Sequence, residues 1–182
     1  MQAQGYRVAR SWEKAGALPS GKTLVVAAPG NLPPPSKRGD VFRQAAVKAL
    51  DTLSRNPNGF FLMIEGSNID KAAHSNNLEE MMEELLDFDR TAGAVLDWAS
   101  KHPGTLVVIT ADHNTGAFAL TGGSREQGEI TGRFGSGSHD GVAVPVYAFG
   151  AGSGDFTGSY ENTAIFRKIM DAFKKGAGKP VR

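Results

Sequence analysis

Residues 105–116 read TLVVITADHNTG, a nearly continuous apolar run followed at once by an aspartate, a histidine and a turn sequence. Two further runs of the same kind, TLVVAA at 23–28 and FFLMI at 60–64, precede it in the chain. Strands that are covered on both faces of a parallel sheet are apolar throughout, whereas half-buried strands alternate between apolar and polar residues. The three runs therefore predict the central strands of a largely parallel sheet.

Longer amphipathic stretches separate these runs and predict helices. In residues 76–101 the apolar side chains recur near helical spacing. The other expected elements are helices at 41–55 and 161–174 and strands at 6–9 and 144–149. Short strands that alternate with longer helices are typical of α/β proteins. The expected fold class is α/β, with a largely parallel sheet flanked by helices.

The size and composition of the chain indicate one folded domain over residues 1–182. The chain has a mass of 19.2 kDa, and 40% of its residues are hydrophobic and 21% charged, which excludes disorder along the whole chain. The formal net charge is +1 and the basic residues are scattered, so neither nucleic acid nor an acidic membrane surface is an expected partner. The sequence contains no apolar stretch of about 18 residues and no visible signal segment.

Metal-binding residue types follow the predicted strands. The chain has no cysteine, so a transition metal would need histidine and carboxylate ligands. Glu65 follows the run at 60–64, Asp112 and His113 follow the run at 105–110, and His139 precedes the last predicted strand. Open α/β sheets bind ligands at the carboxyl ends of their strands, where such residues would converge.

Asp70 and His74 are four residues apart, which places them on one face if the segment is helical. By itself this spacing is also that of an ordinary surface pair. Together with the residues at the strand ends it predicts a site for two cations. The stretch 122–141 is rich in glycine and predicts a long loop or an irregular hairpin, which carries His139 near its end.

Four segments, in this order, resemble the alkaline phosphatase family: FFLMIEGSNIDKAAHSNN at 60–77, TLVVITADHNTG at 105–116, HDGVAVPVYAFG at 139–150 and GSYENTAIF at 158–166. Phosphoglycerate mutases and sulfatases share an Asp-His pair at a strand end, but they do not resemble the Glu-Gly-Ser-x-Ile-Asp-x-x-x-His arrangement. The resemblance extends from about residue 22 to residue 173. The segments resemble the carboxyl-terminal portion of the sequences in that family.

The resemblance implies a phosphatase that hydrolyses phosphate monoesters with two zinc ions and an adjacent magnesium ion. It implies that Asp70, His74 and His139 hold one zinc. It assigns Asp112 and His113 to the second zinc, Glu65 to the magnesium and Lys71 to a position near the phosphate of the substrate. It also implies a periplasmic or extracellular location.

The chain departs from the family where the nucleophile is concerned. The serine nucleophile of the family lies in an Asp-Ser-Ala motif, which does not occur in these 182 residues. The remaining magnesium ligands and the phosphate-binding arginine belong to the same earlier region of the family. We therefore expect incomplete second-zinc and magnesium sites, no catalytic residue of this chain's own and little activity of the chain alone. A smaller departure is Asp140, where a threonine commonly follows the last histidine.

Alternatives to this interpretation stay open. The chain could form a homodimer or combine with a separate amino-terminal half that completes the site. It could instead be a non-catalytic zinc-binding module or a truncated remnant. The alternation of strands and helices would also permit a flavodoxin-like domain without a metal, against which the metal-type residues argue.

Overall fold

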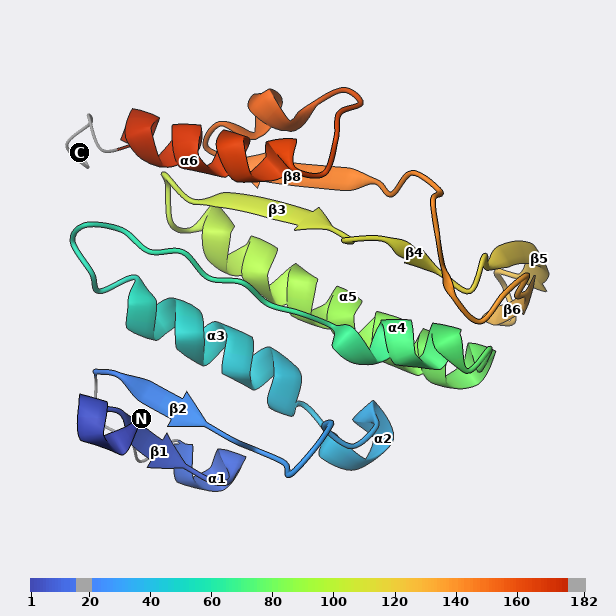
Figure 1. Cartoon of the computed structure of the whole chain (residues 1–182), viewed down its shortest axis with the longest axis horizontal. Coiled ribbons are helices and arrows are strands. Elements are labelled where there is room, and N and C mark those ends of the chain that lie inside the picture. The colour runs from blue at the N-terminus through green and yellow to red at the C-terminus, as the bar shows by residue number, and fades with distance from the viewer. Residues whose placement is uncertain (16–20, 177–182) are drawn as a thin grey trace. The chain divides into compact units, whose positions relative to one another are not determined.

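The structure is a computed structural model that describes residues 1–15 and 21–176 (Figure 1). The chain divides into two compact units, Met1–Ile64 and Glu65–Arg182, and each is described here by itself. That the whole of 1–182 forms a single domain stays a prediction. Among the described residues, no helix combines the length and the apolar character needed to span a bilayer.

The first unit contains a two-stranded parallel sheet and a 13-residue helix. Strand β1 (Arg7–Ala9) pairs in parallel with β2 (Thr23–Val25). Helix α3 (Val41–Leu53) buries Ala46 and Leu50, which are four residues apart and so share one face. The short elements of this unit are η1 (Gln2–Gln4), α1 (Trp12–Ala15) and α2 (Pro35–Arg38).

Residues 60–64 lie in no strand, so the prediction of a central strand there is wrong. Phe61 and Met63 are 60% and 67% exposed, respectively. A strand requires a hydrogen-bonded neighbouring strand, and none of the described strands pairs with this segment in a sheet. An apolar run reports that a segment is suited to burial, but it does not report which partner is present.

The second unit is built on two helices that pack against each other. Helix α4 (Ser67–His74) buries Ala72 and Ala73, which form a core cluster with Met81 of helix α5 (Leu78–Ser100). The chain reverses between the helices through Asn76, whose φ is 53°. Asn77 caps α5, because its side chain accepts a hydrogen bond from the Glu80 backbone N–H at 3.2 Å. The helix expected at 76–101 is confirmed.

Three antiparallel strand pairs complete the sheet structure of the second unit. Strand β3 (Leu106–Thr110) pairs with β8 (Val146–Gly150), β4 (Asn114–Thr115) with β7 (His139–Asp140), and β5 (Ala119–Ser124) with β6 (Glu129–Arg133). The α/β class is confirmed, but the described strands form one parallel and three antiparallel pairs, so a largely parallel sheet is not. A continuous apolar run does not show whether a strand pairs in the parallel or the antiparallel direction.

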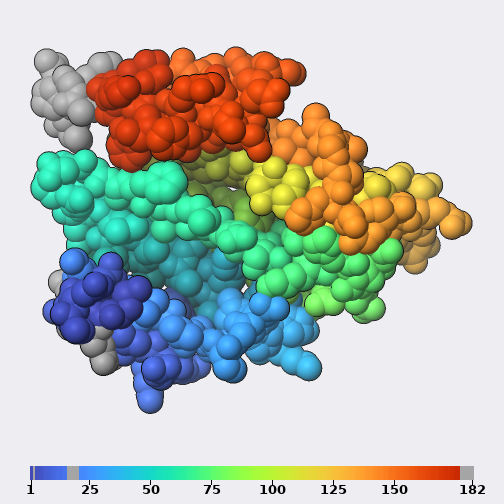
Figure 2. Space-filling model, viewed as in Figure 1, coloured from blue at the N-terminus to red at the C-terminus, as the bar shows by residue number. Residues whose placement is uncertain are grey.

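Of the long loop or irregular hairpin expected at 122–141, the structure has a hairpin, which begins at residue 119. Strands β5 and β6 form it, with a register shift between Leu120 and Gly122. It projects at one end of the second unit, and Figure 2 shows the same end in space-filling form. The chain then returns through β7 and β8 to η2 (Ser153–Phe156) and α6 (Ala164–Gly176).

Candidate metal centre

Asp70 and His74 occupy one face of α4. The buried residues Ala72 and Ala73 pack the helix against Met81 of α5. The Nε2 atom of His74 lies 3.4 Å from Oδ2 of Asp70. The helical spacing therefore brings an imidazole nitrogen and a carboxylate oxygen together without any long-range contact.

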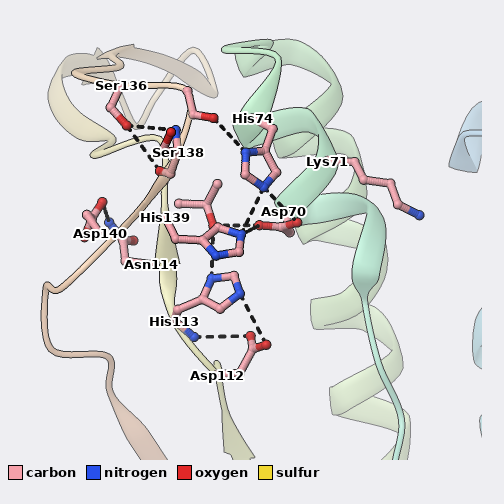
Figure 3. Close-up of polar contacts among 12 residues, drawn as sticks. Asp70, Lys71, His74, Asp112, His113, Asn114, Ser136, Ser138, His139 and Asp140 are labelled. Carbon is pink, nitrogen blue, oxygen red and sulfur yellow. Dashed lines mark hydrogen bonds and ion pairs between the residues drawn. The ribbon is translucent and has the colours of Figure 1, made fainter.

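His139 reaches the same place from β7. Its Nε2 atom lies 3.0 Å from Nε2 of His74 and 3.5 Å from Oδ1 of Asp70 (Figure 3). Ligand atoms of the three residues all lie within 4.8 Å of one another, and among the described residues this is the group that could hold a metal ion. In a tetrahedral zinc site with ligands at roughly 2.0–2.1 Å, neighbouring ligand atoms are about 3.3 Å apart. The separations in this group suit that geometry.

The hydrogen bond that His74 makes through Nδ1 leaves a lone pair for a cation on its Nε2 atom, which faces Asp70 and His139. The Gly137 carbonyl oxygen can only accept, so the His74 Nδ1 atom, 2.7 Å away, carries the proton and donates. In the neutral ring the Nε2 lone pair is then unprotonated and directed at the group. A histidine that binds a metal commonly donates its other N–H to a carbonyl in this way.

Thr115 joins this group to His113. The Thr115 hydroxyl is buried and donates to Oδ1 of Asp70 at 2.6 Å, so it must accept from the His113 Nδ1 atom at 3.2 Å. The Nε2 lone pair of His113 then faces Oδ2 of Asp112 at 3.3 Å. The His113 Nε2 atom and the Asp112 Oδ2 atom are then both acceptors, and a cation or a proton between them would satisfy both. The His113 ring also stacks on His139, with centroids 3.6 Å apart.

Asp140, next to His139, accepts hydrogen bonds from three donors. The bond from the Val142 backbone N–H is the largest cause that holds the pKa of the Asp140 carboxyl below its ordinary value. The Asn114 side chain and the Ala117 backbone N–H lower this pKa further, while desolvation acts in the opposite direction.

The remaining predicted residues lie outside this group. Glu65 is exposed and precedes Gly66, the residue before the first turn of α4. The Lys71 side chain points away from the histidines in Figure 3, and its Nζ donates to Oδ1 of Asn68 at 3.4 Å. A magnesium role for Glu65 and a phosphate role for Lys71 stay predictions. Sequence reasoning missed Thr115 and the bonds of Asp140; the signal for both was a polar residue within two positions of a predicted ligand.

The architecture and this group together define an α/β protein with a candidate centre of imidazole and carboxylate ligands. Residues 31–132, more than half of the chain, match the sequence model of the alkaline phosphatase family. The chain belongs to the alkaline phosphatase family.

Relatives of known name agree with this assignment. The chain is 46% identical over 78 residues to alkaline phosphatase 4 of Bacillus subtilis (strain 168), which is 43% of this chain and 17% of the relative. It is 30% identical over 220 aligned positions to streptomycin-6-phosphate phosphatase of Streptomyces griseus, covering 94% of this chain and 49% of the relative.

Solved structures of the family have the same fold. The alkaline phosphatase of the Antarctic bacterium TAB5 matches 95% of this chain with a TM-score of 0.80 and 32% identity, over 53% of its own length. A mutant of that enzyme with bound Mg matches with a TM-score of 0.83 at the same identity, with 95% and 54% covered. The chain thus spans about half the length of the relatives that it matches almost throughout.

Proposed function

We propose that this chain carries the zinc-ligand half of an enzyme that hydrolyses phosphate monoesters. The observation that carries the proposal is the triangle of His74 Nε2, His139 Nε2 and the Asp70 carboxylate, whose edges measure 3.0, 3.4 and 3.5 Å. Imidazole and carboxylate are the ligands that zinc prefers in proteins without cysteine. The membership in the alkaline phosphatase family supports the reaction class.

In this proposal the triangle holds the first zinc. The second zinc is bound by Asp112 and His113, whose acceptor atoms face each other 3.3 Å apart. Magnesium is assigned to Glu65, and Lys71 to the phosphate of the substrate, from the family resemblance. The second zinc and the magnesium have too few ligands in this chain for closed sites, so their affinity is expected to be lower than that of the first zinc.

Bound metal would activate an attacking oxygen and stabilise the charge on the phosphoryl group. The residues of this chain prepare the site for it. Thr115 donates to one oxygen of Asp70 and restricts its rotation. The Gly137 carbonyl fixes the tautomer of His74. The Asp112 and His139 side chains are 87% and 51% exposed, which leaves the centre open to a substrate.

The nucleophile is not assigned to this chain. The Asp-Ser-Ala motif is absent from the sequence. Ser136, near the centre, has its hydroxyl engaged in the loop: Oγ donates to the Ser138 carbonyl oxygen at 3.2 Å and accepts from the Ser138 backbone N–H at 2.9 Å. We therefore expect the isolated chain to have little or no turnover, because a positioned nucleophile and a phosphate clamp are both lacking.

The test measures zinc and turnover separately. Elemental analysis after dialysis should find zinc in the parent chain and less zinc in His74→Ala, while His102→Ala retains the parent value. His102 is the matched control, because it stacks on Trp98 with ring centroids 3.6 Å apart and takes no part in the group. Equal zinc content in all three chains would overturn the assignment of the first site.

Turnover is measured as phenolate release from an aryl phosphate at alkaline pH, by the zinc- and magnesium-loaded chain. Rates at the level of the uncatalysed reaction are expected. Robust turnover that Asp112→Ala abolishes would contradict the missing nucleophile and would place it within these residues. Turnover that appears only when an amino-terminal half of a family member is added would support complementation.

A non-catalytic zinc-binding module is the second candidate. It is favoured by the same absence of Asp-Ser-Ala together with a ligand group formed within one compact unit, Glu65–Arg182. Zinc binding without turnover, unchanged when an amino-terminal half is supplied, would select this candidate.

A further inference from the structure

We propose that Asp140 is the positioning residue of the metal centre, because its carboxylate ties the segment that carries His139 to the turn that follows His113. This inference rests on the proposed metal-binding function of His139. Asp140 itself lies outside the group of candidate ligands Asp70, His74 and His139.

One oxygen of Asp140 binds the strand-end turn. Oδ2 accepts from the Asn114 side-chain amide at 2.9 Å and from the Ala117 backbone N–H at 3.1 Å. Asn114 directly follows His113, and Ala117 adopts a left-handed conformation with φ 45°. Such a conformation is unfavourable for a residue other than glycine, so it persists where surrounding contacts hold it.

The other oxygen binds the segment that leaves the site. Oδ1 accepts from the Val142 backbone N–H at 3.0 Å. One carboxylate thus connects β4, the turn after it and the residues after β7. Hydrogen bonds to an ionised carboxylate are stronger than those between neutral groups, so a few such bonds are enough to hold these segments together.

The ladder between β4 and β7 requires such a connection. It consists of two residue pairs, Asn114 with Asp140 and Thr115 with His139. Neighbouring residues of a strand point to opposite faces, so the carboxylate of Asp140 and the ring of His139 leave the strand in opposite directions. Asp140 therefore holds the ladder from the face away from the metal centre, where a bound metal would leave it untouched.

His139 depends on this placement more than His74 does. It lies 65 residues from His74 in the chain, so no local spacing brings the two Nε2 atoms within 3.0 Å. The contacts that orient its ring are the stack on His113 and the approach to Asp70 and His74. If the segment shifts, the third corner of the triangle is lost while the first two remain.

The test uses the full chain with Asp140→Ala and Asp140→Asn, and with Asp171→Ala as the control. Asp171 is an exposed carboxylate on α6 that pairs with Lys174 at 3.1 Å, so its removal changes the net charge equally and leaves the centre intact. Zinc affinity is measured by competition with a chromophoric chelator. In Asp140→Ala it should fall roughly 10- to 100-fold, as for loss of an outer partner of a metal ligand. In Asp171→Ala it should not change.

A second readout needs no metal. In the metal-free chain, nuclear Overhauser contacts between the His113 and His139 rings report the stack directly. They should weaken in Asp140→Ala while backbone amide signals elsewhere keep their parent positions, which separates local placement from general unfolding. If the alanine variant does not fold, Asp140→Asn is compared in the same way, because it keeps one acceptor oxygen.

Exchange of the two bridging side chains provides a rescue. Asn114→Asp alone places two carboxylates opposite each other and should weaken both readouts. Combined with Asp140→Asn, it restores the amide–carboxylate bridge with the roles reversed but leaves the Ala117 backbone N–H facing an amide donor, so the ring contacts should return in part.

The outcomes separate this inference from the proposed function. The positioning role would be overturned if the ring contacts persist in Asp140→Ala and its zinc affinity stays within about twofold of the parent. A change of that size is smaller than the loss of an outer partner causes. A parent chain that binds no zinc, but loses its ring contacts in Asp140→Ala, would refute the metal site and leave the positioning role standing.

Discussion

The two sides of the candidate centre are built in different ways. Asp70 and His74 come from a single helix, where a separation of four residues is enough to bring them within 3.4 Å. His113 and His139 come from segments far apart in the chain, and a ladder of two residue pairs brings their rings within 3.6 Å. The helical side, Asp70 and His74, depends on local geometry. The strand-end side, His113 and His139, depends on long-range pairing.

Their support differs as well. Helix α4 buries Ala72 and Ala73 against α5, so apolar packing holds the helical side. The strand-end side is held by polar groups: the hydroxyl of Thr115 and the carboxylate of Asp140. Hydrogen bonds are directional, and the loss of one partner leaves the other unsatisfied. We expect the strand-end side to be the more easily disturbed.

The largest effect is expected from removal of a corner of the triangle. His139→Ala and His74→Ala should each lower zinc affinity by more than the roughly 100-fold upper range seen for outer partners, because a direct ligand is lost. Titration with a competing chelator measures this. If His102→Ala lowered affinity to the same extent, the loss would not be specific to the centre.

Metal removal should destabilise the chain. Zinc at about 100 times its dissociation constant stabilises a folded protein by about 2.7 kcal/mol, which corresponds to roughly 5–10 °C in melting temperature for a chain of this size. Excess EDTA should lower the melting temperature by that amount. In His139→Ala the EDTA effect should largely disappear, and an equal effect in both chains would argue against binding at the triangle.

Thr115→Val tests the link between the two sides. The variant keeps the volume of the side chain but removes the donor to Asp70 and the acceptor for His113. Loss of this buried hydroxyl should cost about 1–3 kcal/mol in the free energy of unfolding, measured by denaturant titration. Thr115→Ser, which retains the hydroxyl, should stay closer to the parent; equal losses in both would show that the methyl group matters instead.

The smallest effect is expected from a substitution at the start of α5, which supports the helical side but lies away from the ligands. Asn77→Ala removes the cap of α5, which should cost about 1 kcal/mol and lower the melting temperature by roughly 2–4 °C. Zinc content should be unchanged, because apolar packing keeps α4 in place. A marked loss of zinc in this variant would break the contrast between the two sides.

Much of the fold and of the site could be predicted wherever local rules apply. The helical positions of residues 41–53, 78–100 and 164–174 follow from apolar spacing, and the hairpin follows from its glycines. The pairing of Asp70 with His74 follows from the helix repeat. The motifs around these residues were also sufficient to indicate the alkaline phosphatase family.

Tertiary structure alone decided the rest. The direction of β8 against β3, the absence of 60–64 from the described strands and the bonds of Thr115 and Asp140 depend on partners that no local pattern identifies. An apolar run reports the tendency of a segment to be buried, and a polar residue reports a capacity to form hydrogen bonds. Which partner satisfies either of them depends on contacts between segments distant in the chain, and these exist only in the folded protein.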